Sequence, residues 1–144
     1  MAYEEALRSI TLKADATVAL YTGVPGQPGS ADPNGGFQYS FVKATSTAGT
    51  VGLADATANE LVLGVMQNKP QYTGQAATVA IRGVSKVTAG TGGVAAGDGI
   101  KVDSVIDGTG VTATPGTDAA LVVGVALDSA SAGQLFPCLL RLGA

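Results

Sequence analysis

The apolar runs of this chain are all short, and this limits the folds open to its 144 residues more than any other feature. The longest runs, residues 61–66 and 135–142, have the length of a β-strand and are far below the roughly 18 residues that a membrane-spanning helix needs. Turn sequences rich in glycine separate the runs, and no segment keeps a helical apolar period over three turns. The sequence therefore predicts an all-β fold, a small β-barrel or sandwich.

Two segments of similar sequence recur 59 or 60 residues apart. Residues 61–65 read Leu-Val-Leu-Gly-Val, and residues 121–125 read Leu-Val-Val-Gly-Val. Each segment is followed by a Gly-Gln pair and, seven residues after the glutamine, by an arginine: Gln75 and Arg82, Gln134 and Arg141. We interpret the match as two similar hairpins with Gly64 and Gly124 in equivalent places. The alternative is chance similarity in a chain rich in glycine, valine and alanine.

The first 36 residues differ from the rest of the chain. Residues 23–36 hold three of the six prolines, and a loop of this length is uncommon in a compact domain unless it is functional. We predict an extended N-terminal arm and a long Pro/Gly-rich loop over residues 1–36. A β-barrel domain with the two hairpin units is predicted over residues 37–144. The latter begins with residues 37–41, whose alternating aromatic and polar side chains indicate a half-buried strand.

The arm carries too few large apolar residues to form a core of its own. We therefore expect them to contact a partner, with two aromatic residues anchoring the arm to the barrel. The candidate interface residues are Tyr3, Leu7, Ile10, Leu12, Phe37 and Tyr39. The alternative is that the arm folds back and forms ordinary strands of the barrel.

Charge and composition exclude several classes of function. The net charge is −3, and no two of the eight basic residues are adjacent, so we expect no nucleic-acid partner. The N-terminus lacks a basic secretory region, and we expect neither export nor a membrane partner. The chain has no histidine and a single cysteine, Cys138, which excludes His-based triads, His-ligated metals and cysteine zinc sites. We predict no catalytic residue, no metal and no cofactor, and hence no enzyme.

Several motifs occur in an order that resembles the capsid decoration, or cement, proteins of tailed bacteriophages and prophages. They lie at residues 1–10, 63–70, 77–84, 94–102 and 123–130. The resemblance implies a small β-barrel that adds to the outside of an assembled head. It also implies contacts with the major capsid protein that reinforce the shell against internal pressure.

The same resemblance implies the partners and the location. We expect the major capsid protein as partner and a homo-oligomer on the capsid, with a trimer favoured over a dimer. The protein would be made in the host bacterial cytoplasm and would reside on the outer capsid surface of the virion. The alternative function is a β-sheet binding module, an adhesin or carbohydrate-binding domain on a virion or cell surface. That function would require an exposed aromatic platform.

Overall fold

The computed structural model describes residues 7–19, 37–56 and 61–142. Nearly all of their regular structure is β-strand, and one 3-10 turn, η1 (Ala119–Leu121), is the only helical element of these ranges. The all-β class predicted from the sequence is thus confirmed. The strands are β1 (Arg8–Ala14), β2 (Phe41–Ala44), β3 (Thr50–Leu53), β4 (Val62–Met66), β5 (Ala76–Arg82), β6 (Val84–Thr88), β7 (Gly99–Val102), β8 (Gly110–Thr112), β9 (Gly124–Ala126) and β10 (Leu135–Leu140).

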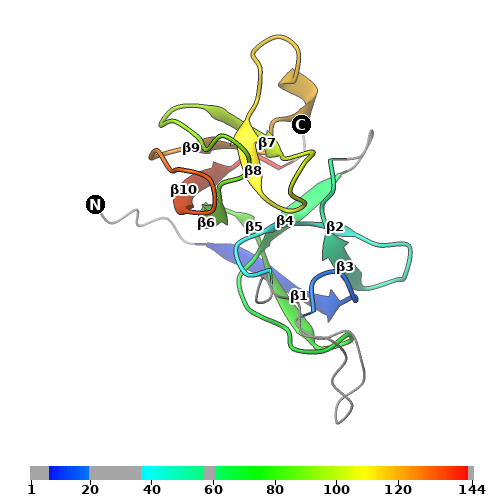
Figure 1. Ribbon diagram of the computed structural model, residues 1–144. Coiled ribbons are helices and arrows are strands. Elements are labelled where there is room, and N and C mark those ends of the chain that lie inside the picture. Colours follow the sequence, from blue (N-terminus) through cyan, green and yellow to red (C-terminus); the bar gives the residue numbers. More distant parts are fainter. Residues whose placement is uncertain (1–6, 20–36, 57–60, 143–144) are drawn as a thin grey trace.

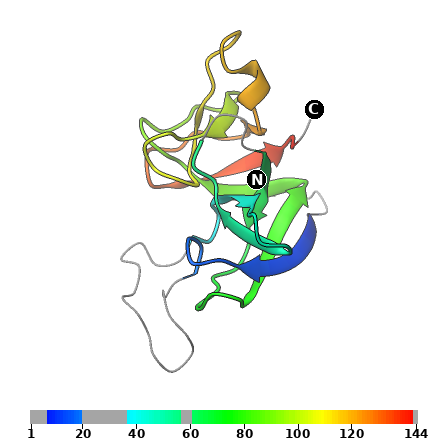
Figure 2. The ribbon, with the colours of Figure 1, turned by 90° about the vertical axis from the view of Figure 1, so that its right-hand side faces the viewer.

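The ten strands form two units of five. The first five close into a barrel in the order β1-β3-β2-β4-β5, and the last five form a sheet in the order β6-β10-β9-β7-β8. Figures 1 and 2 show the second unit, coloured from green through yellow and orange to red, above the first unit, in blue to green. Each unit is continuous in the sequence, so strands that are close along the chain are also close in space.

The two hairpins that share a sequence pattern also share their pairing register. In the first unit, Val65 of β4 lies opposite Ala80 of β5. In the second unit, Val125 of β9 lies opposite Leu139 of β10, and these are the counterparts of Val65 and Ala80 at the repeat distances of 60 and 59 residues. The repeat seen in the sequence therefore has a structural counterpart.

The equivalence extends to all five strands of each unit. Strands β2 and β3 pair Lys43 with Gly52, and strands β7 and β8 pair Lys101 with Val111 at the corresponding positions. A parallel pairing between β1 and β3 closes the first barrel. In the second unit, the corresponding contact is a single parallel bridge between Ala89 and Gly110. The fold is therefore a tandem repeat of one five-stranded unit, closed fully in the first copy and only by this bridge in the second.

The structure places residues 8–14 in the barrel, and this corrects the expected arm. Strand β1 pairs with β5 over its whole length, with Ile10 opposite Val79 and Leu12 opposite Ala77. Both side chains are half-buried and pack against the core of the first barrel. The physical reason is the alternation of apolar and polar residues in β1, which suits a strand with one face on a core. The remaining arm positions, residues 1–6 and 20–36, lie outside the described residues.

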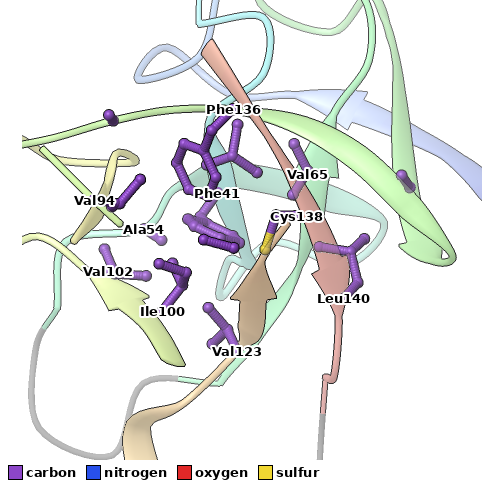
Figure 3. Packing of buried hydrophobic residues seen from close by; sticks show 14 residues of the cluster. Phe41, Ala54, Val65, Val94, Ile100, Val102, Val123, Phe136, Cys138 and Leu140 are labelled. Carbon is purple, nitrogen blue, oxygen red and sulfur yellow. The ribbon is translucent and has the colours of Figure 1, made fainter. Parts of the chain in front are cut away.

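Each unit has its own hydrophobic core, and the first unit contributes to the second core. The first core fills the closed barrel and includes the buried side chains of Val18, Val42 and Met66. The second core lies on the inner face of the second sheet, and Phe41 of β2 points into it (Figure 3). The first unit thus covers the side of the second sheet that would otherwise be open.

Hydrogen bonds tie the same segment of the first unit to both edges of the second sheet. The Thr88 N–H of β6 donates to the Tyr39 carbonyl at 2.9 Å, and the Phe41 N–H donates to the Gly108 carbonyl at 2.7 Å. Tyr39 lies in a turn with a φ of 64°, and β2 begins only at Phe41. The predicted strand over residues 37–41 is therefore wrong, because this positive φ interrupts the extended backbone.

Candidate functional site

A groove of about 990 Å³ runs between the two units and is lined mainly by apolar side chains. The larger apolar side chains of its lining are those of Leu61, Leu63, Ile81, Leu121, Val123 and Leu142. We call this feature the inter-repeat groove. Exposed apolar side chains that lie together in a groove with polar residues at its rim make it a candidate interaction site.

Both repeats contribute to the groove through equivalent segments. Leu61 directly precedes β4, and Leu121, its counterpart in the sequence repeat, ends η1 shortly before β9 begins at Gly124. Their side chains are 83 % and 50 % exposed, so burial within the chain does not explain why both are leucine. Groove residues Leu63 and Ile81 pack against the first core, and Leu142 packs against the second. Packing against both hydrophobic cores therefore fixes the positions of these lining side chains.

One of the three arginines of the chain lines this groove, and the other two are connected to it through the pairing of neighbouring strands. Arg141 lines it directly, and Arg82 follows the lining residue Ile81. The Leu140 N–H donates to the Gly83 carbonyl at 3.0 Å, which ties the residue before Arg141 to the residue after Arg82. Arg8 lies directly opposite Arg82 in the β1–β5 pairing. All three side chains are exposed, and none has an ion pair among the residues that the structure describes.

Lys101 also lines the groove, but unlike Arg141 it has an ion-pair partner within the chain. Lys101 Nζ donates to Asp118 Oδ2 at 2.8 Å, and this hydrogen bond lowers the pKa of Asp118 below its usual value. The first repeat holds an equivalent pair, in which Lys43 Nζ lies 2.8 Å from Asp55 Oδ2. Both of these lysines have a carboxylate partner within the chain, whereas the groove arginine, Arg141, has none among the described residues.

The interface residues predicted from the sequence do not form one cluster. Tyr3 lies outside the described residues. Leu7 is 39 % exposed just ahead of β1. Ile10 and Leu12 both pack against the first core, and Ile10 also lines the groove. Phe37 and Tyr39 are half-buried beside the second sheet, where Lys86 Nζ lies 5.8 Å from the centre of the Tyr39 ring. Their contact with a partner stays a prediction.

Several buried or hydrogen-bonded aspartates of the second unit have structural roles. Asp103 is buried and accepts hydrogen bonds from the Thr91 and Val105 N–H groups at 2.8 and 2.9 Å. Asp98 accepts a hydrogen bond from the Ala95 N–H at 3.1 Å. Within the described part of the chain, no three acidic or cysteine side chains converge to hold a metal ion. None of its helices is long and apolar enough to cross a membrane.

The groove was not among the features predicted above, although the amino-acid sequence contains a signal for it. The repeat places leucine at both Leu61 and Leu121, and arginine at both Arg82 and Arg141. A glycine or a buried residue that recurs in both repeats is explained by backbone geometry or core packing. An exposed residue that recurs in both repeats is not explained in this way. The repeat itself could therefore have indicated a common surface.

The fold resembles that of one solved phage protein along almost its entire length. That structure is described as the crystal structure of the head fiber gp8.5 N base in bacteriophage phi29. The TM-score is 0.61 and the sequence identity is 20 %, and the match covers 94 % of this chain and 95 % of that one. No protein-family model and no curated protein sequence matches this chain. At this identity, the likeness establishes a common fold.

Proposed function

We propose that this chain is a bacteriophage head decoration, or cement, protein. It binds the outer surface of the assembled capsid and stabilises the shell by bridging copies of the major capsid protein. The observation that carries the proposal is the whole-length fold match to the base of a phage head fiber. The role is carried over by likeness of fold between two chains that are 20 % identical, so the proposal depends on a direct binding experiment.

The surface of the molecule supports a binding role. Leu61 and Leu121 expose apolar area that would be removed from water against a partner. Burial of apolar surface contributes roughly 25 cal/mol per Å², so a groove with several such side chains can supply a useful affinity. On a shell that repeats the same contact many times, modest affinity per site gives strong total reinforcement.

The proposal includes an assembly state and a location. We expect copies to associate on the capsid as homo-oligomers, with a trimer favoured over a dimer, on the outer surface of the virion. The net charge of −3 suits an outward position, away from the packaged nucleic acid.

The test uses heads of the phage that encodes this chain, assembled without it. Purified protein is mixed with expanded heads and with unexpanded precursor heads, and each mixture is sedimented. We expect the protein to co-sediment with expanded heads at a saturating, fixed ratio to the capsid protein. We also expect decorated heads to release their nucleic acid at a higher temperature than bare heads. Absence of binding to expanded heads would contradict the proposal.

A further inference from the structure

We propose that the inter-repeat groove binds an extended segment of the capsid protein in which apolar side chains are accompanied by carboxylates. This inference rests on the proposed function, because it names the part of the capsid protein that this surface recognises. The apolar half of the recognition comes from Leu61, Leu121 and their neighbours. The three arginines are the reason to expect acidic side chains in the bound segment.

The placement of the arginines is costly unless an anion accompanies them. Arg8 and Arg82 are paired across the antiparallel strands β1 and β5, next to a register shift, and like charges at paired positions destabilise a sheet. A third arginine, Arg141, lines the groove, and the hydrogen bond between Leu140 and Gly83 connects its strand to the residue after Arg82. No acidic side chain among the described residues pairs with any of the three. This concentration of positive charge stands out on a chain whose net charge is −3.

The choice of arginine also points to carboxylates. A guanidinium presents donors in a planar fork that matches the two oxygens of a carboxylate, and it is desolvated more easily than an ammonium. The other cation at the groove, Lys101, already donates to Asp118. An occupant with acidic side chains would therefore meet the arginines, and its apolar side chains would meet the leucines.

The first test removes the arginine charges. The Arg82→Gln/Arg141→Gln double variant is compared with Lys13→Gln/Lys69→Gln, which removes the same charge from exposed positions that do not line the groove. Co-sedimentation with expanded heads is measured between low and high salt. We expect the arginine variant to bind at least about tenfold more weakly at low salt and to lose most of its salt dependence. The lysine variant should stay within about twofold of the wild type.

The second test changes the sign of one charge inside the groove. Leu61 is 83 % exposed, so both Leu61→Asp and Leu61→Lys should fold, which a thermal melt checks. Both changes remove the same apolar contact, but only aspartate repels an acidic occupant. We expect Leu61→Asp to bind at least about tenfold more weakly than Leu61→Lys. Equal loss in the two variants would overturn the acidic character of the occupant.

The outcomes separate this inference from the proposed function. If the wild type does not bind expanded heads, both are overturned. If the wild type binds expanded heads, and the arginine variant and both Leu61 variants bind as well as the wild type, only the groove inference is overturned. If the free protein forms an oligomer that the arginine variant dissociates, the groove belongs to a second copy of the chain, and the inference is also overturned.

Discussion

Tyr39 and Gly97 occupy the same position in the two repeats. Their φ angles are 64° and 89°, and the N–H group of each donates at 2.7 Å to a carbonyl on the neighbouring strand, that of Met66 or Ala126. Each residue makes the turn that leads into the second strand of its unit. The first repeat thus places a bulky side chain where the second has glycine, in a backbone region that strongly favours glycine. The Tyr39 ring has a specific location beside Lys86, and its carbonyl links the two units.

The turn at Gly97 gives the first prediction. Gly97→Ala should lower the free energy of unfolding by about 1–2 kcal/mol, because the positive φ is strained for any residue with a Cβ. An added Cβ would meet no other atom within 4 Å, so steric crowding does not contribute. The matched control is Gly99→Ala, where φ is ordinary and the nearest atom is a Val122 methyl at 3.5 Å. Urea denaturation should show the control unchanged or stabilised; equal losses would contradict this account.

The equivalent glycines of the two hairpins give the second prediction. A Cβ on Gly64 would collide with the Ala80 carbonyl oxygen, and a Cβ on Gly124 would collide with the Cys138 Sγ. Gly64→Ala and Gly124→Ala should therefore each destabilise the protein by about 1–3 kcal/mol or more, since neighbouring strands must move apart. Thermal melts of the two variants measure the effect. A neutral result at either position would show that the two strands are less closely apposed than in the structure.

Asp103 gives a prediction about pH. Burial acts to raise the pKa of Asp103, but the hydrogen bonds from the Thr91 and Val105 N–H groups outweigh burial and hold the pKa below its usual value. The carboxylate therefore stabilises the fold above the unfolded-state pKa of about 3.9, and this contribution is lost as the pH falls through the lower folded-state pKa.

The matching variant is Asp103→Asn, whose amide nitrogen cannot accept a hydrogen bond from a backbone N–H. We expect it to cost about 1–3 kcal/mol at pH 7. The difference in unfolding free energy between wild type and variant should shrink as the pH is lowered toward 2. Urea denaturation across this range provides the measurement, and a difference that does not depend on pH would argue against the role given to the charge.

Cys138 gives a prediction about reactivity. Its side chain is fully buried in the second core, and burial raises its pKa to about 12. Because only the thiolate attacks a disulfide reagent, labelling of the native protein at pH 8 should be at least about a thousandfold slower than labelling in urea. Absorbance after addition of an aromatic disulfide reagent reports the rate. Fast labelling without denaturant would place Cys138 at the surface.

The hairpins could be predicted from the sequence because residues 61–65 and 121–125 are nearly identical and are followed by the same Gly-Gln and arginine spacing. At Gly64 and Gly124 the neighbouring strand lies so close that a side chain would not fit. Glycine is therefore required at both positions, and the repeat is visible in the sequence. The strands β2 and β7 are as closely equivalent in register, yet of their paired positions only Lys43 and Lys101 keep the same residue. Backbone hydrogen bonds define those strands, and many side chains satisfy them.

The place of β1 could not be predicted in the same way. Its alternating pattern indicates a strand, but nothing in that pattern says that its partner is β5, far along the chain. The long segment between β1 and β2 also separates β1 from its unit, whereas the corresponding segment between β6 and β7 is short. The groove could not be predicted for a related reason. In the sequence, Leu61 and Leu121 look like the first residues of buried strands, and only the structure shows that both side chains are exposed.

The most direct test of the account is a cryo-electron-microscopy map of expanded heads saturated with this protein, compared with a map of bare heads. We predict additional density on the outer surface that fits the two stacked five-stranded units and bridges neighbouring capsid proteins. The inter-repeat groove and its arginines should face the shell. A shell that shows no added density outside, or that carries the protein only on its inner surface, would contradict the proposed function.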